Sequence, residues 1–172
     1  MQGMTTSFTV RKSNLGDLAA VDGLLSASYP VLLAADYPPS VIVTAVPLIS
    51  RANPALLSSG SYFVVEDGDG SIIGAGGWTE AAPPGGRRRP GIGHIRHVVT
   101  DHRQVRRGVG RALMEHVIAD AENFGITQLE CFSTLTAERF YEAFGFRTIR
   151  PITLSLRAGI EFQSIYMVRE SR

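Results

Sequence analysis

The sequence predicts a single α+β domain whose mixed, mostly antiparallel sheet has about seven strands and is flanked by about four helices. Two observations carry this prediction. Strand-like runs joined by glycine-bearing turns occur in both halves of the chain, and between them a strand, a glycine turn, a helix and a further strand make one βαβ unit. In order, the patterns read β-α-α-β-β-β-α-β-α-β-β.

Length and composition limit the classes of protein. At 172 residues, with 44% hydrophobic and 19% charged residues, the chain fits one globular domain over 1–172. The net charge of +1 gives no overall attraction to nucleic acid, and no apolar run approaches the roughly 20 residues of a membrane span. No signal peptide is evident, and the single cysteine, Cys131, fits a reducing cytoplasm. We therefore expect a cytoplasmic protein without nucleic-acid or membrane partners, and no metal site.

The first quarter of the chain predicts a strand and two helices. Phe8–Arg11 has a strand pattern, and Asn14 is the expected N-cap of a helix that runs through Leu25. Proline-containing pairs then break the chain, beginning with Tyr29-Pro30. Ser40 is the expected cap of a second helix, which Pro47 should bend or shorten.

A hairpin follows. Ser61–Glu66 and Ser71–Glu80 are β-rich runs joined by the turn Asp67–Gly70, whose Asp-Gly pairs favour a hairpin. Several glycines in the second run predict a bulge or a close backbone approach. The loop over 81–91 contains Arg87–Arg89, which is either solvated or faces an acidic partner.

The centre of the chain combines a strand, a basic turn and an amphipathic helix. His94–Thr100 is the strand, and from Val109 apolar residues recur at helical spacing. The turn between them contains four arginines and two glycines: Arg103, Arg106, Arg107, Gly108, Gly110 and Arg111. Free N–H groups and the dipole at a helix N-terminus attract anions, glycine allows close approach, and arginine suits phosphate. We interpret this turn as a pyrophosphate cradle.

The last third predicts a strand, a short helix and a closing hairpin. Gln128–Ser133 is the strand that completes the βαβ unit, and its Cys131 reads as a buried, inert thiol. Thr136–Phe144 is a short helix that Gly145 ends. Two alternating runs, 147–156 and 161–168, form the hairpin.

Two known phosphate motifs do not fit the cradle. An NTP-binding P-loop needs Lys-Ser/Thr after its second glycine, and a dinucleotide fingerprint needs a third glycine. Here Gly110 is followed by Arg111-Ala112-Leu113, so neither motif is present.

The turn instead resembles the Q/R-x-x-G-x-G/A signature of the GCN5-related N-acetyltransferases, with Gly108 and Gly110 in place. Val105 departs from it, because the family has Gln or Arg there. A second segment, Ala137–Phe146, resembles the family's A-x-x-F-Y-x-x-x-G-F pattern.

The resemblance implies a fold and a cofactor. In the family, the fourth and fifth strands splay apart, and main chain on the fourth strand pairs with the pantetheine arm of acetyl-coenzyme A. These positions correspond here to Val98, Val99 and Thr100, and an N–H near Val98 would face the acetyl carbonyl. The residues implied for the diphosphate are Val105, Arg106, Arg107, Gly108, Val109, Gly110 and Arg111, and Thr134 stands where relatives often have a cofactor-binding Asn.

Catalytic roles are also implied by resemblance. Tyr141 corresponds to the acid that protonates the leaving thiolate, and a phenol with a pKa near 10 is protonated at neutral pH. His94 falls where several relatives place a base, on the strand face that should also carry Arg96, Val98 and Thr100. His97, Glu80 and a water chain remain rivals of His94 for this role.

The sequence thus predicts direct transfer of an acetyl group from acetyl-coenzyme A to an amine of a small molecule or a peptide. The alternative is a domain that binds acyl-coenzyme A as a sensor or interaction module. An unrelated phosphate-binding domain is disfavoured by the second motif. The acceptor pocket is expected between Tyr29 and Gly60 and in the loop after Glu80, where Tyr29 and Tyr37 either line it or pack the loop. Pairing of two copies through the terminal strands is expected from the family.

Overall fold

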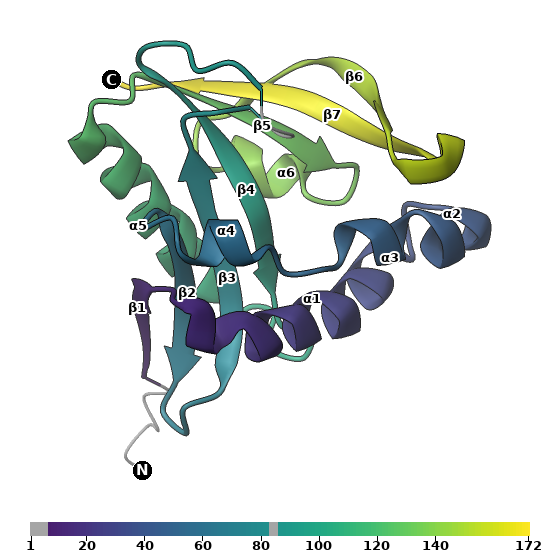
Figure 1. Cartoon of the computed structure of the whole chain (residues 1–172), viewed down its shortest axis with the longest axis horizontal. Helices are drawn as coiled ribbons and strands as arrows, with labels where there is room; N and C mark the ends of the chain where they lie inside the picture. The colour runs from purple at the N-terminus through teal and green to yellow at the C-terminus, as the bar shows by residue number, and fades with distance from the viewer. Residues whose placement is uncertain (1–6, 83–85) are drawn as a thin grey trace.

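The computed structural model describes residues 7–82 and 86–172 and confirms the predicted α+β fold (Figure 1). Seven strands form one sheet in the order β1-β2-β3-β4-β5-β7-β6, and each neighbouring pair is antiparallel except β4 and β5. Residues 83–85 of the predicted loop lie outside the described residues. The strands are β1 Phe8–Lys12, β2 Tyr62–Asp67, β3 Ile72–Thr79, β4 Ile92–Thr100, β5 Gln128–Thr134, β6 Arg147–Ser155 and β7 Glu161–Glu170.

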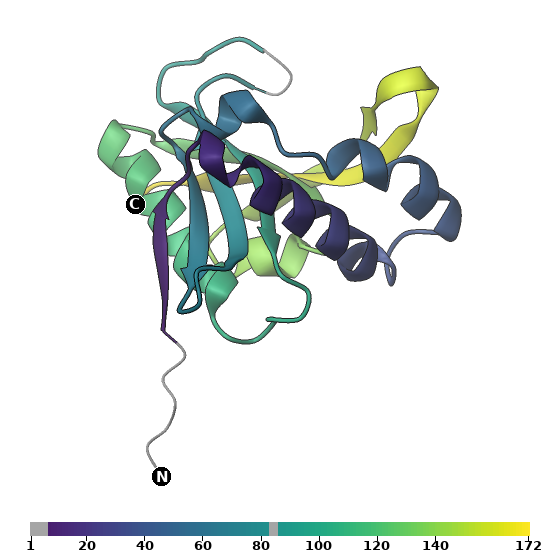
Figure 2. The ribbon, with the colours of Figure 1, turned by 60° about the horizontal axis from the view of Figure 1, so that its bottom comes forward.

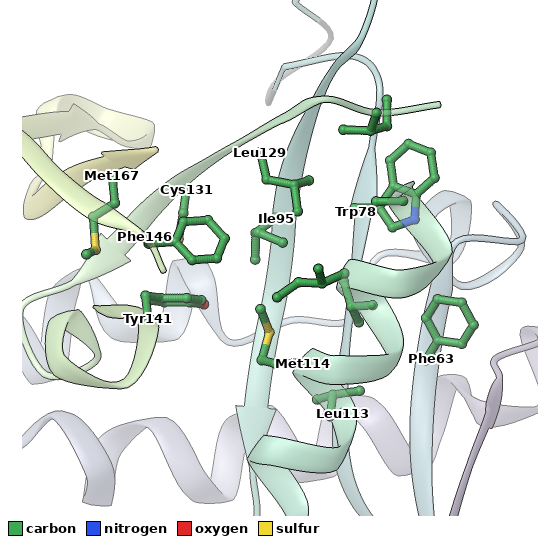
Figure 3. Packing of buried hydrophobic residues seen from close by; sticks show 14 of the residues in the cluster. Phe63, Trp78, Ile95, Leu113, Met114, Leu129, Cys131, Tyr141, Phe146 and Met167 are labelled. Atoms are coloured by element: carbon green, nitrogen blue, oxygen red, sulfur yellow. The ribbon is translucent and has the colours of Figure 1, made fainter. Parts of the chain in front are cut away.

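Helices cover both faces of the sheet, as Figure 2 shows. On one face α5 (Val109–Phe124) buries the stripe predicted from its spacing against β2, β3 and β4, in a cluster that Figure 3 shows from close by. On the other face α1 (Leu18–Leu33) packs its buried leucines against Tyr62, Val64 and Val99. The sheet therefore lies in the middle of the molecule, with an apolar core on each side.

The prediction that Tyr29-Pro30 breaks the first helix is wrong. Pro30 lies inside α1, which continues to Leu33. The reason is tertiary packing: Leu33 is buried with Val46 and Phe162 in a third cluster, and this burial offsets the backbone hydrogen bond that proline removes. Asn14 does act as a cap, but of the short 3₁₀ turn η1 (Leu15–Asp17) that precedes α1.

The expected second helix is broken, as Pro47 predicts. It forms α2 (Pro39–Thr44) and α3 (Val46–Ile49), and a short α4 (Pro54–Leu57) follows. Ser40 is not its cap, since Pro38 occupies the N-cap position and Pro39 the first helical turn, where proline's fixed φ and missing N–H are tolerated. The helices of the described residues thus outnumber the four expected, because the proline-rich segment forms several short ones.

The β2–β3 hairpin and its irregular second strand are confirmed. Gly77 on β3 lies very close to β2: a Cβ atom there would meet the carbonyl oxygen of Ser61 and, at 2.6 Å, the Cα of Tyr62. Glycine is required here because two backbones approach each other.

The βαβ unit and the closing hairpin are also confirmed, with one boundary corrected. The helix predicted over 136–144 is shorter, α6 (Glu138–Glu142), because the N–H of Ala137 donates to both the carbonyl and the Oγ1 of Thr134 and makes a turn before it. Gly145, at φ +89°, follows the helix as expected. Among the described helices, none has the length and apolar character needed to cross a membrane.

Gly77→Ala should destabilise the protein, because the added methyl group meets main chain that cannot move aside. We expect a loss of about 2 kcal/mol in the free energy of unfolding, measured by urea denaturation. The matched control is Gly23→Ala in α1, where the methyl group meets nothing within 4 Å and alanine favours the helix by up to about 1 kcal/mol. Equal urea midpoints for the two variants would contradict this account of β3.

Candidate active site

A cavity of about 400 Å³ lies where β4 and β5 separate. The two strands pair only from Ile92 to His94 on β4 and from Gln128 to Glu130 on β5, and beyond these positions they diverge, as Figure 1 shows. The cavity fills this opening, and α1, α3, α6 and the hairpin β6–β7 complete its walls. It therefore runs through the gap in the sheet, and most of its lining is apolar.

A β-bulge shapes the β4 wall. Arg96 pairs with Gly77 and Val99 with Ala75, so His97 and Val98 together oppose one residue of β3. His97 has φ +45°, which is uncommon for a residue with a side chain. Because the bulge adds a residue, the alternation of faces changes along β4, and the prediction that His94, Arg96, Val98 and Thr100 share one face is wrong. Ile95 and Val98 both contact the α5 core.

Two tyrosine hydroxyls stabilise the bulge. Tyr62 donates to the carbonyl of His97 and Tyr29 to that of Val98, each at 2.9 Å. Tyr29 also lines the cavity. Tyr37 only packs: it stacks on Phe162, donates to the carbonyl of Gln163 and accepts from the N–H of Leu135.

The backbone of the cradle is open to a ligand. Arg106 (φ +71°) and Gly108 (φ +80°) are both left-handed, and such turns make concave groups of N–H donors. Within the described residues, no hydrogen bond uses an N–H from Val105 to Arg111. Gly108 is the N-cap of α5 and has open space where a Cβ would lie, whereas Gly110 packs closely against the ring of Phe140. Main-chain donors and the helix dipole thus meet at one exposed point.

The cradle arginines divide into two pairs. Arg103 is bonded to Asp101 at 3.0 Å, and Arg107 to Asp67 at 3.1 Å and to Gln104 at 2.7 Å. Their guanidinium groups therefore hold the turn together, and the prediction that Arg107 contacts the diphosphate rests on its main-chain N–H. Arg106 and Arg111 are exposed and have no ion pair with any described residue. Val105, at the position that departs from the family signature, is 52% exposed.

Tyr141 lies on the cavity wall but within the core. It is 6% exposed and is the buried residue of α6. Its ring packs beside Phe146 and near Cys131, as Figure 3 shows. Burial raises the pKa of the Tyr141 hydroxyl well above 10, so this group stays protonated at neutral pH.

His94 is not part of the cavity lining, although it was the leading candidate base. It is 4% exposed, and its Nδ1 lies 3.4 Å from Glu130 on β5. Burial lowers the pKa of His94. The bulge at His97 changes which face of β4 the later residues occupy, so His94 does not share a face with all of them. Glu80, a rival candidate, does not line the cavity either, whereas His97 does. Burial lowers the pKa of His97 to about 4.

The β5 side of the cavity presents a thiol and a hydroxyl. Cys131 is buried, and burial raises its pKa to about 12, in agreement with an inert thiol. Thr134 lines the cavity beside the start of α6, where its Oγ1 accepts from the N–H of Ala137 at 3.2 Å. Its hydroxyl proton is not used by that bond and remains able to donate.

Two lining residues were missed by sequence reasoning as site residues. Arg96 on β4 is half-buried, and its Nη1 donates to Thr79 Oγ1 at 3.1 Å. Ser164 on β7 is 1% exposed, and its Oγ has no hydrogen-bond partner among the described residues. A charged residue amid an apolar strand is a signal that points to Arg96, but nothing in the sequence distinguishes Ser164 from other strand serines.

Comparisons with known proteins agree with this geometry. A sequence model of the acetyltransferase (GNAT) domain matches residues 34–168. No curated protein matches the chain.

Solved structures with the same fold include three relatives of low sequence identity. A GCN5-related N-acetyltransferase from Rhodopseudomonas palustris is 20% identical, covers 98% of this chain and 99% of its own, and has a TM-score of 0.78. The PaiA N-acetyltransferase from Thermoplasma acidophilum, in complex with coenzyme A, is 12% identical over 96% and 99%, with a TM-score of 0.70. The ribosomal-protein-S18-alanine N-acetyltransferase from Escherichia coli is 20% identical over 95% and 94%, with a TM-score of 0.62.

The stability of the protein should fall as the pH drops from about 6.5 to about 4. In this range the unfolded state binds a proton on His97 and the folded state does not, so acid favours unfolding. His97→Asn should reduce the loss by roughly 2 kcal/mol while keeping the bulge, because asparagine tolerates positive φ. Urea midpoints at pH 7.5 and pH 4.5 measure the difference. An unchanged acid loss in His97→Asn would exclude a buried, neutral His97.

Proposed function

The chain belongs to the acetyltransferase (GNAT) family, and on this premise we propose that it transfers an acetyl group from acetyl-coenzyme A directly to an amine. One observation carries the proposal: an anion cradle and a buried phenol lie along the same opened strand. The cradle is at the N-terminus of α5, directly after β4, and Tyr141 lines the cavity between β4 and β5.

The proposed binding of the donor uses main chain. The free N–H groups from Val105 to Arg111 suit a diphosphate, and Arg106 and Arg111 add charges near it. Val98, Val99 and Thr100 line the cavity on β4 where β5 no longer pairs, so their backbone suits an extended amide chain. Thr134 faces the same cavity from β5. Coenzyme A in the Thermoplasma relative, which has the same fold, supports this class of donor.

Acetyl-coenzyme A, when bound, supplies an acetyl group activated as a thioester. The role proposed for Tyr141 is to hold the proton that the departing sulfur takes up. Its raised pKa keeps that proton on the oxygen at neutral pH, so the hydroxyl can hydrogen-bond to the sulfur as negative charge develops there. The N–H of Val98, in the stretch of β4 that β5 does not pair, is the proposed donor to the acetyl oxygen.

No side chain is assigned as the base. His97 lines the cavity, but with a pKa of about 4 it is a weak proton acceptor for an amine. His94 and Glu80 do not line the cavity. The proposal is therefore that the amine loses its proton to water at the mouth of the cavity, which was one of the alternatives that the sequence left open.

A second candidate is a domain that binds acyl-coenzyme A without turnover. Val105 in place of Gln or Arg, and a cavity without a carboxylate base among the described residues, favour it. Release of free thiol from acetyl-coenzyme A across a panel of amines separates the two. Binding of the cofactor with no thiol release on any amine would support the sensor.

The pairing of two copies and the location in the cytoplasm remain predictions. β6 lies at the edge of the sheet, so pairing of two copies through the terminal strands is compatible with the fold. Location in the cytoplasm rests on the composition and on the single buried cysteine.

Gly108→Glu should raise the dissociation constant for coenzyme A by about 100-fold or more, because it puts a negative side chain at the anion cradle. Isothermal titration calorimetry measures the change. Gly60→Glu is the matched control, since Gly60 also has positive φ (+84°) and open space but lies outside the cradle. If Gly108→Glu folds and retains the wild-type affinity, the diphosphate does not bind at this turn.

Tyr141→Phe should lower kcat by roughly 100-fold and leave the affinity for coenzyme A nearly unchanged, because only the proton is removed. Steady-state kinetics and calorimetry report the two quantities. Tyr37→Phe serves as the control, because Tyr37 is a buried, hydrogen-bonded tyrosine outside the cavity. Equal losses in kcat and in affinity for Tyr141→Phe would indicate a structural role.

A further inference from the structure

We infer that the acceptor is a small amine with an apolar body and a carboxylate, of the chemical class of apolar amino acids, and that Arg96 binds its carboxylate. The inference rests on the proposed function, since it names the acceptor of the same site. It depends on the charges of the cavity wall, on the contacts of Arg96 and on the unpaired hydroxyl of Ser164.

The cavity wall is suited to an apolar acceptor with few charges. Among the residues that line it, none is Asp or Glu, and Arg96 is the one side chain with a permanent charge. The part formed by α1, α3 and the β6–β7 hairpin is apolar, with Leu33, Ile49, Leu154 and Phe162. An acceptor with several ammonium groups would lose water here without gaining a counter-charge, which is unfavourable. The wall therefore disfavours polyamines and aminoglycosides.

Arg96 is a half-buried cation that lacks an anionic partner. Its hydrogen bond goes to the neutral hydroxyl of Thr79, and no carboxylate of the described residues lies within ion-pair distance. The remaining residues, 1–6 and 83–85, contain no Asp or Glu. Burial lowers the pKa of Arg96, which shows that its charge is poorly solvated. A carboxylate that enters the cavity would supply the missing partner, and the planar guanidinium binds such a group with two hydrogen bonds.

The buried carboxylate on the next strand does not serve Arg96. Glu130 accepts from Arg89 at 2.5 Å and from the hydroxyl of Tyr166 at 2.8 Å, and it lies beside His94. Both hydrogen bonds go to its Oε1, its Oε2 lies 3.4 Å from Nδ1 of His94, and no ion pair joins it to Arg96. Because Arg96 lines the cavity and has one hydrogen bond among the described residues, its other donors are available to a ligand there.

Ser164 provides a second polar contact in the same cavity. It is buried on β7, it lines the cavity, and its Oγ has no partner among the described residues. A buried hydroxyl without a partner is costly, and a ligand that bonds to it removes that cost. A hydroxyl can donate to a carboxylate or accept from an amine, so an acceptor that carries both groups suits a wall with one arginine and one serine.

The test compares acids with their amides. Acetyl transfer is measured with leucine, methionine and phenylalanine, with the corresponding amino acid amides, and with spermidine. We expect the best acid to have a KM at least about tenfold below that of its amide, the factor expected for a charge-assisted pair. Amides as good as the acids, or a preference for spermidine, would overturn the inference while leaving the proposed function supported.

Variants of Arg96 assign the effect to this residue. Arg96→Gln should raise the KM for the acid about tenfold and leave the KM for acetyl-coenzyme A and for the amide unchanged, whereas Arg96→Lys should restore part of the difference. Arg172→Gln, at the exposed end of the chain, is the control. An acid-to-amide ratio that is the same in Arg96→Gln as in the wild type would overturn the role of Arg96. If Arg96→Gln does not fold, the acid-to-amide ratio of KM values is measured in Arg96→Lys. A ratio equal to that of the wild type would then overturn the role of Arg96.

A measurement of amino acid binding without turnover tests this inference separately from the proposed function. Calorimetric titration of the same amino acids into protein saturated with coenzyme A requires no turnover. Binding that depends on Arg96, with no acetyl transfer to any amine, would support the carboxylate site and overturn the transferase. Absence of binding by every acid of the panel would overturn the carboxylate site.

Discussion

The structure depends on one constraint: β4 must separate from β5 in the middle of the sheet without leaving its backbone polar groups unsatisfied. It pairs with β5 only from Ile92 to His94, and from there to Thr100 its one partner strand is β3, across the bulge. Buried carbonyl groups without partners are costly. Tyr62 and Tyr29 bond the carbonyls of His97 and Val98 from the α1 side, so the opening remains stable. The edge of β4 from Val98 to Thr100 no longer pairs with β5 and is the part proposed to bind a ligand.

The position of α5 follows from the strand next to β4. A Cβ on Gly74 would lie 2.9 Å from Val109, and one on Gly76 would lie 2.9 Å from Val98 and 3.3 Å from Leu113. Small residues on β3 therefore allow the first turns of α5 to lie close to the sheet. The ion pair of Arg107 with Asp67 fixes the same end of the helix to the β2–β3 turn. The cradle is held at the end of the opened strand by these contacts.

Much of this arrangement could be predicted from the sequence, because it is local. The strand, the glycine turn and the helical spacing after Val109 indicate the cradle, and the Asp-Gly pairs indicate the hairpin. Features that depend on tertiary contacts could not be predicted. Pro30 is tolerated because Leu33 is buried, and the bulge at His97, which reverses the faces of β4, arises from pairing with β3. The resemblance to the family indicates His94 as a base, but His94 does not line the cavity.

The central claim is that one opened strand positions the donor cofactor from its diphosphate to its reactive sulfur. A crystal structure of the protein with coenzyme A tests it most directly. The account predicts diphosphate oxygens within hydrogen-bond distance of the main-chain N–H groups between Val105 and Arg111, the pantetheine arm beside Val98–Thr100, and the sulfur near the hydroxyl of Tyr141. A diphosphate bound elsewhere, with the gap between β4 and β5 empty, would contradict the account.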